Sequence, residues 1–228
     1  MSATDLGSHP VRSFVRREGR MTDAQKRALM DLWSIYGIDN HGAPLGKALF
    51  SEPRELTLEI GFGDGEALVN LAKQQPEAGF IGIDPHRPGA GRLLLQLQRE
   101  GIKNLRVIIG DAAELLPRLL ASASLSRVLV LFPDPWPKKR HHKRRLLNVS
   151  FLQMLSTKLQ HGGQLHIATD WREYAEEILT AVDIVPELRN TAGKLQFIGR
   201  PDWRPVTKYE RRGLGLGHDV FDIAATRL

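Results

Sequence analysis

Apolar residues along the chain alternate between short continuous runs and stretches with helical spacing. The continuous runs are rich in Leu, Ile and Val and are of strand length; they lie at 56–60, 80–84, 105–111, 127–132 and 162–170. Between the runs, apolar residues recur three or four positions apart, which is typical of a helix with one buried face. This alternation predicts an α/β fold with a mainly parallel central sheet and helices on both faces.

The helices are expected behind each strand, and the end of the chain is expected to return to the sheet. The predicted helices cover 64–75, 91–101, 112–120, the segment around 147–159 and the segment around 171–182. Trp171 belongs to the apolar stripe of the last of these helices, so we expect it in the core. Residues 213–228 alternate small and apolar side chains and predict a final edge strand whose glycines shape a bulge.

The first 50 residues differ from the rest. Thr22 and Gln25 have the spacing of a capping box, and an amphipathic pattern follows them as far as Gly37. Upstream is an arginine-rich arm. We therefore predict an appendage at 1–50, flexible near its start, and a single α/β domain at 51–228.

The positive charge of the chain is concentrated in one segment. The net charge is 32 − 26 = +6. Six lysines and arginines between 138 and 145 supply as much charge as this whole excess; they are Lys138, Lys139, Arg140, Lys143, Arg144 and Arg145. A run of this kind is either a solvated face or a footprint for nucleic acid.

Composition excludes several classes of function. Cysteine is absent, which removes disulfides, thiolate metal sites and cysteine nucleophiles. No apolar run approaches membrane-spanning length. We expect a cytoplasmic protein that binds neither membrane nor metal, and the sequence leaves open whether it is a monomer or a homodimer.

The segment EIGFGDGE at 59–66 has the strongest local pattern. Gly61 and Gly63 follow a predicted strand and precede a predicted helix, where glycine allows a sharp turn and close approach to a ligand. A tight βα turn without a ligand has the same appearance. The third glycine of a dinucleotide fingerprint is replaced by Glu66, which disfavours a dehydrogenase, and Glu59 suits a cation better than a pyrophosphate.

Two further acids stand at strand ends. Asp84 ends the second strand, where a carboxylate accepts from ribose hydroxyls. Asp111 ends the third strand, where it either accepts from an adenine amino group or caps the next helix. Together with Glu59, these acids describe a pocket for adenosine linked to a cationic amino acid, as in S-adenosylmethionine.

Five segments resemble the bacterial tRNA (guanine-N7)-methyltransferases. They are RSFVRREGRMT (12–22), EIGFGDGE (59–66), FPDPWPKKRHHKRR (132–145), ATDWREYA (168–175) and TKYERRGLGLGHDVFD (207–222), in the order of that family. The resemblance implies a Rossmann-like class I methyltransferase fold, S-adenosylmethionine as cofactor and tRNA as partner. The implied activity is methylation of a guanosine at N7, in the variable loop, to give 7-methylguanosine.

The resemblance also implies roles for individual residues. Glu59, Gly61, Gly63, Asp84, Asp111 and Asp134 would bind the cofactor, and Asp134 would also be catalytic. Substrate contacts would come from Lys138, Asp170, Thr207, Lys208, Tyr209 and Glu210. RNA contacts would come from Arg140, His141, His142, Lys143, Arg144 and Arg145. Asp84 departs from the family, which usually has the longer Glu at this position, so its reach toward a ribose is shorter.

The chemistry of guanine N7 agrees with these roles. N7 has a free lone pair, so methylation needs no strong base, and a fixed carboxylate such as Asp134 would stabilise the positive charge that develops on the purine. Trp136 could stack on a base, and Asp170 or Glu210 could accept from the Watson–Crick edge of guanine. For Asp170, a helix N-cap is an equally good role.

Two other functions fit parts of the sequence. An exocyclic-amine methyltransferase uses an Asn- or Asp-Pro-Pro-aromatic loop, whereas this loop has one proline too few after Asp134. A non-catalytic RNA-binding module that keeps the fold is the second alternative. The five segments favour guanine N7 over both.

Overall fold

The computed structural model describes residues 19–39, 44–45, 49–50 and 54–228. In this part of the chain, seven strands form one sheet in the order β3-β2-β1-β4-β5-β7-β6. The strands are β1 Leu56–Ile60, β2 Gly79–Asp84, β3 Leu105–Ile109, β4 Leu125–Leu131, β5 Leu159–Thr169, β6 Leu188–Asn190 and β7 Phe221–Arg227. The predicted α/β class and the five predicted strands are confirmed.

The order of the strands determines where a ligand can bind. β1 to β5 are parallel, and β1 lies between β2 and β4. The chain therefore runs outward in one direction from β1 to β3 and in the other direction from β4. In open α/β sheets, ligands bind beyond the carboxyl ends of the strands at such a switch point.

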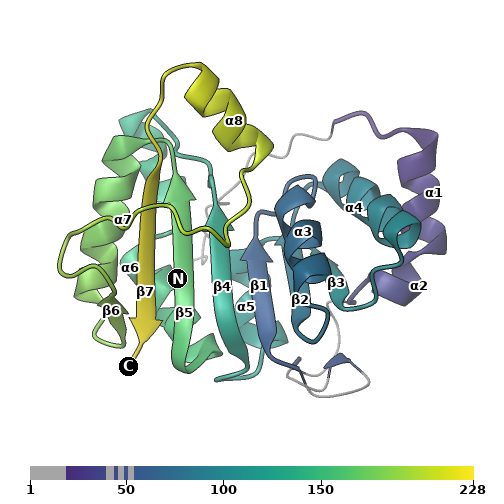
Figure 1. The fold of residues 1–228 in the computed structure, drawn as a ribbon, viewed down its shortest axis with the longest axis horizontal. Coiled ribbons are helices and arrows are strands. Elements are labelled where there is room, and N and C mark those ends of the chain that lie inside the picture. The colour runs from purple at the N-terminus through teal and green to yellow at the C-terminus, as the bar shows by residue number, and fades with distance from the viewer. Residues whose placement is uncertain (1–18, 40–43, 46–48, 51–53) are drawn as a thin grey trace, which may run out of the picture.

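Helices cover both faces of the sheet (Figure 1). α3 Glu66–Gln74 and α4 Arg87–Glu100 lie in front of it in this view, while α5 Ala112–Leu119 and α6 Val149–Lys158 lie behind. α7 Arg172–Ile184 shares the core of α5 and α6. Alternate residues of β4 enter different cores: Val128 and Val130 pack with α5 to α7, and Leu129 and Leu131 with α3 and α4. This alternation explains why the strand reads as a continuous apolar run.

The described part of the N-terminal segment packs against the domain. α1 Asp23–Asp31 begins with the predicted capping box of Thr22 and Gln25, and α2 Trp33–Tyr36 is followed by Gly37. α1 contacts α4, and Leu32 is buried in the same core as α3 and α4. A Cβ at Gly91 of α4 would lie 2.9 Å from Gln25, so glycine permits this close approach. The arm before residue 19 lies outside the described residues.

The C-terminal prediction is wrong in two respects. Residues Lys208–Gly215 form a helix, α8, and the strand begins only at Phe221. The strand β7 is also not an edge strand, because it runs antiparallel between β5 and the short β6 that the sequence pattern did not predict. Because of this arrangement, the end of the chain returns across the sheet after α8 has passed over its upper end (Figure 1).

Among the described helices, none has the length and apolar character that crossing a lipid bilayer requires.

Candidate functional site

A cavity of about 550 Å³ lies at the carboxyl ends of the parallel strands. Residues from four successive strand ends line it: Gly61 and Gly63 after β1, Asp84 in β2, Asp111 after β3 and Asp134 after β4. The opposite wall comes from the C-terminal region and includes Tyr209, Arg212, Gly213, Leu216 and His218. The cavity has the size of a typical small-molecule site and lies where the fold predicts one.

The turn after β1 needs its glycines. Gly61 and Gly63 have φ values of +78° and +60°, in the left-handed region that other residues rarely adopt. Tyr209 closes over this turn, because a Cβ at Gly63 would lie 3.5 Å from the Tyr209 ring. The structure thus brings the turn and the C-terminal segment together across the cavity.

Asp84 supports the glycine turn. Its Oδ2 accepts from the Gly63 amide at 2.8 Å, and its Oδ1 accepts from the His86 amide at 2.7 Å. The side chain is buried, and burial raises its pKa, partly offset by the His86 and Gly63 amides. Asp84 therefore orders the cavity wall, and each of its oxygens keeps a further lone pair for a ligand.

Glu59 is a buried carboxyl group with an unused oxygen. The residue is 3% exposed, and Oε2 has no hydrogen-bond partner among the described residues. Burial, followed by repulsion from Asp84 and Asp64, raises its pKa to about 8. Glu59 is thus mainly protonated at neutral pH, and a cation beside it would restore the ionised form.

Asp111 has the cap role that the sequence left open, and its role toward adenine stays a prediction. Its Oδ1 accepts from the Ala113 amide at 2.9 Å, so it is the N-cap of α5. It also lines the cavity. A carboxylate that is held as a cap in this way is a fixed acceptor for a ligand.

The loop after β4 has a strained conformation on both sides of Asp134. Phe132 and Trp136 have φ values of +55° and +47°, which is uncommon for bulky residues. Arg145 Nε donates to the Pro135 carbonyl at 2.8 Å and ties the loop to the basic segment. Strain of this kind is often found at functional sites, and here the loop presents an exposed Asp134 to the cavity.

Trp136 does not have the position that base stacking would need. It is 9% exposed, and the Arg144 guanidinium covers its ring at 4.9 Å from the centroid. The His141 ring contacts it edge-on at 5.8 Å. The expectation that this ring stacks on a base is therefore wrong, since Arg144 and His141 already cover it.

The basic segment forms a 3₁₀ helix, Lys139–Arg144, beside the loop. Lys138, Lys139, Arg140 and Lys143 are exposed, and Arg144 is partly exposed. The pKa of His141 is lowered, first by desolvation and then by Arg140 and Arg144, and this disfavours the charged form of the ring. The exposed cations form a surface next to the cavity.

Arg145 does not belong to this surface. Its side chain is 3% exposed, and Nη1 lies 2.6 Å from Glu177 Oε2. The guanidinium also covers the Tyr174 ring at 5.0 Å. The assignment of Arg145 to RNA contact is wrong, because the guanidinium is buried and engaged with α7.

His142 lies near the same acids. Its ring nitrogens are 3.6 Å from Glu173 and 3.7 Å from Glu177. These three residues have the composition of a metal site. However, Arg145 Nη1 lies 2.6 Å from Glu177 and 3.6 Å from Glu173 and already supplies the positive charge that the two carboxylates need. His142 is only partly exposed and faces α7 as well as solvent.

Asp170 is not the cap of α7. The N-cap position is Trp171, and the Trp171 amide donates to Thr169 Oγ1 at 3.3 Å. Asp170 lines the cavity instead, with Oδ2 3.4 Å from His218 Nδ1. Trp171 is only partly buried and also lines the cavity, so it contributes to both the core and the site.

The segment from Thr207 to Glu210 begins α8. Thr207 Oγ1 accepts from the Glu210 amide at 3.1 Å and caps the helix. Lys208 forms an ion pair with Asp64, in the loop after β1, and Tyr209 is half exposed at the cavity. Glu210 is 2% exposed and does not line the cavity, because both of its carboxylate oxygens accept from Arg204. The predicted contact of Glu210 with the substrate stays a prediction, and in this structure both of its oxygens are occupied by Arg204.

Several residues of the site were not predicted. Arg212, Leu216 and His218 line the cavity, and Asp64 pairs with Lys208. One signal was available: Thr-x-x-Glu at 207–210 is the start of a capping box and predicts a helix N-terminus. The predicted strand at 213–228 includes Leu216 and His218, and for this reason their contribution to the cavity wall was not predicted.

Comparison with known sequences gives a consistent result. The family model described as "Putative methyltransferase" matches residues 53–223. A "tRNA (guanine-N(7)-)-methyltransferase" of Nitrosococcus oceani is 51% identical over 221 residues, which are 96% of this chain and 91% of that protein. A protein of the same description from Alkalilimnicola ehrlichii is 48% identical over 95% of this chain and 92% of its own length.

Comparison with solved structures supports the fold. The 30S ribosomal A1408 methyltransferase from an uncultured bacterium superimposes with a TM-score of 0.56. The match covers 92% of this chain and 96% of that one, at 16% identity. The central sheet and its helices therefore have the Rossmann-like arrangement of class I methyltransferases.

The high pKa of Glu59 makes stability depend on pH. The unfolded chain releases the Glu59 proton near pH 4.5, whereas the folded protein keeps it up to about pH 8. The proton bound to Glu59 therefore contributes its full stabilisation of the folded state below about pH 4.5, and this contribution is lost as the pH rises toward 8. Relative to Glu59→Gln, the wild type should lose up to about 1.4 kcal/mol of unfolding free energy per pH unit in this window.

Urea unfolding of both proteins at several pH values between 5 and 8 measures this difference. Glu77→Gln, which changes an exposed carboxyl group, is the matched control and should keep the pH dependence of the wild type. If Glu59→Gln also follows the wild type at every pH, then Glu59 ionises in the folded protein as easily as in the unfolded chain.

Proposed function

The chain belongs to the tRNA (guanine-N7)-methyltransferase family, and from this premise we propose that it methylates N7 of a guanosine in the variable loop of tRNA. The product is 7-methylguanosine, and the reaction takes place in the cytoplasm. The observation that carries the proposal is the convergence of Asp84, Asp111 and Asp134 at one cavity, with the buried Glu59 directly before the lining residue Ile60, beside a surface of exposed cations.

The residues present fit S-adenosylmethionine, the cofactor of this enzyme class. Glu59 has a buried oxygen without a partner, which suits the ammonium group of the methionine part. Asp84 and Asp111 are fixed by backbone amides and offer acceptors for ribose hydroxyls and for the adenine amino group. The cofactor supplies an electrophilic methyl group on a sulfonium sulfur.

Asp134 is the proposed catalytic residue. It is exposed to the cavity and close enough to Asp84 to raise the pKa of that carboxyl group. Guanine N7 attacks through its free lone pair, so no proton has to be removed first. The Asp134 carboxylate stabilises the positive charge that grows on the purine, and the restricted loop keeps the carboxylate in place.

Recognition of guanine falls to the wall opposite the glycine turn. Asp170 offers a carboxylate that accepts from the N1 and N2 donors of guanine, and Tyr209 offers a half-exposed ring for stacking. Lys138 lies at the start of the exposed cationic segment and binds a phosphate near the target nucleotide.

The exposed cations next to the loop bind the tRNA backbone. Lys139, Arg140 and Lys143 are exposed, and Arg144 is partly exposed over Trp136. Their phosphate contacts give affinity and register rather than sequence specificity.

Nucleoside analysis tests the reaction and the role of Asp134 together. Purified protein is incubated with S-adenosylmethionine and unmodified tRNA, and the tRNA is digested and examined by mass spectrometry. Wild type should form 7-methylguanosine. Asp134→Ala should lower kcat by about 10²- to 10³-fold, because a fixed charge that acts in the transition state is removed, while tRNA affinity stays nearly unchanged.

Asp31→Ala, at the exposed end of α1, is the matched control and should retain wild-type turnover. Formation of N6-methyladenosine or of a methylated cytidine by the wild type would contradict the proposed base and favour an exocyclic-amine methyltransferase. Normal turnover by Asp134→Ala would remove Asp134 from the mechanism.

The cationic surface predicts a specific salt dependence. Replacing Lys139, Arg140 and Lys143 with Ala should weaken tRNA binding and reduce the slope of log K against log salt by about 1 for each lost phosphate contact. Fluorescence anisotropy over a range of salt concentrations measures this slope.

Arg145→Met is the matched comparison from the same segment. Because Arg145 is buried against Glu177, this change should lower the unfolding free energy by about 1 to 3 kcal/mol and leave the salt slope of the folded protein unchanged. An unaltered salt slope in the triple variant would contradict phosphate contact by Lys139, Arg140 and Lys143. A reduced salt slope in Arg145→Met would contradict a purely structural role of Arg145.

A further inference from the structure

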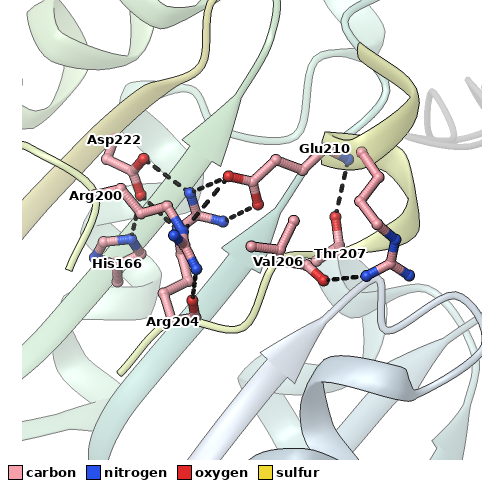
Figure 2. A network of polar contacts seen from close by, with 8 residues as sticks. His166, Arg200, Arg204, Val206, Thr207, Glu210 and Asp222 are labelled. Atoms are coloured by element: carbon pink, nitrogen blue, oxygen red, sulfur yellow. Dashed lines mark hydrogen bonds and ion pairs between the residues drawn. The ribbon is translucent and has the colours of Figure 1, made fainter. Parts of the chain in front are cut away.

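A chain of buried polar and charged groups lies beneath the start of α8 (Figure 2). Arg204 has no exposed surface, and Glu210 of α8 and Asp222 of β7 are each 2% exposed. His166 of β5 completes the chain, with Nε2 2.8 Å from Asp222 Oδ1. These four residues, called here the Arg204 network, join the sheet to the helix that forms the opposite wall of the cavity.

The Arg204 network uses both oxygens of Glu210. Arg204 Nη1 donates to Glu210 Oε2 at 2.6 Å, and Nη2 donates to Oε1 at 2.9 Å. This is the two-pronged geometry in which arginine and carboxylate bind each other most strongly. Figure 2 shows that the Glu210 carboxylate points away from its own helix toward Arg204. A base in the cavity could reach it only after this pair had separated.

Arg204 is also held from the side of the sheet. Nη2 donates to Asp222 Oδ2 at 3.0 Å, and Nε lies 2.8 Å from Oδ1. Burial disfavours the charge of Arg204, but Glu210 and Asp222 outweigh this effect, and the pKa of Arg204 is raised. Arg200 lies at the rim, with Nε 3.6 Å from Glu210, and balances the second carboxylate. Buried charges with this degree of pairing fix one geometry, since any displacement leaves a charge without its partner.

The helix that the Arg204 network holds carries part of the cavity wall. Tyr209, Arg212 and Gly213 of α8 line the cavity. α8 fits closely against Asp170, because a Cβ at Gly213 would lie 3.2 Å from Asp170 Oδ2. A displacement of α8 would therefore move Tyr209 and also disturb the proposed guanine acceptor Asp170.

The far side of α8 contacts the glycine turn. Lys208 pairs with Asp64, and Arg211 Nη2 donates to both oxygens of Glu66 at 2.9 and 3.0 Å. These groups are partly or fully exposed, so the contacts are weaker than those of the Arg204 network. The position of α8 is thus set mainly by Arg204.

We propose that Arg204 and Glu210 are positioning residues for the guanine-binding wall: they act through each other to hold α8, and Glu210 does not touch the substrate. This inference rests on the proposed function, because it concerns the same site. In this proposal Glu210 acts on guanine indirectly, through Arg204, and makes no direct contact with the base. The sequence analysis did not identify Arg204.

A double-mutant cycle on Arg204→Met and Glu210→Gln distinguishes the two roles. Loss of positioning should lower kcat/KM for tRNA by about 10²-fold in each single variant. Because each residue acts through the other, the double variant should be no worse than the poorer single variant, within about threefold. Independent contact of Glu210 with guanine would instead make the two losses multiply.

Three readouts separate positioning from a general loss of structure. Rates are measured at a temperature where circular dichroism shows each variant to be folded. Affinity for S-adenosylmethionine, measured by calorimetry, should stay within about threefold of wild type, because the acids of that site lie on other elements. Arg204→Lys, which keeps the charge but loses the two-pronged geometry, should recover only part of kcat/KM.

Arg189→Met, at an exposed position of the edge strand β6, is the control and should behave as wild type. If Arg204→Met does not fold, the cycle is measured with Arg204→Lys and Glu210→Gln. Normal kcat/KM in the folded single variants, or multiplied losses in the double variant, would overturn the proposal. Absence of 7-methylguanosine with the wild-type protein would overturn the proposed function instead, so the two failures are distinguishable.

Discussion

The burial of the Glu59 carboxyl group is the constraint on which the site depends. Parallel strands bring the residues at their carboxyl ends to one edge of the sheet, and here these residues are acids. Glu59 is the most deeply placed of them, and its Oε2 has no partner among the described residues. Its pKa of about 8 shows that the folded chain favours the neutral form. A cationic group beside Glu59 would turn this unfavourable burial into an attractive contact, and the proposed ammonium site rests on this argument.

The wall of the cavity opposite the glycine turn depends on the C-terminal part of the chain, which comes back to the sheet as β7. β7 inserts antiparallel between β5 and β6, and residues of the preceding helix α8 line the cavity. Asp222 in β7 binds Arg204, and Arg204 binds Glu210 in α8. These buried contacts therefore hold α8 in position, although most of this helix is exposed. The proposed cofactor side and the proposed guanine side are built from different parts of the chain and meet at Gly63 and Tyr209.

Much of the fold and part of the site could be predicted from the sequence. Strands such as β1 and β4 are buried on both faces and give continuous apolar runs, and glycines with positive φ at 61 and 63 mark the turn between strand and helix. The prediction failed where long-range contacts decide the structure. Arg145 lies within a cationic run, and only the packing of α7 buries it. The sequence predicts that Glu210 contacts guanine, but in the folded chain both of its carboxylate oxygens accept from Arg204.

Proton release on cofactor binding tests the central claim about Glu59 most directly. At about pH 6.5 the ammonium group of S-adenosylmethionine is already charged, whereas free Glu59, with its pKa of about 8, is protonated. Calorimetric titration in buffers of different ionisation enthalpy should therefore show release of nearly one proton per bound ligand. Glu59→Gln should bind more weakly and release none. Tight binding to the wild type without proton release would show that Glu59 does not ionise against the ligand, and would contradict this account of the site.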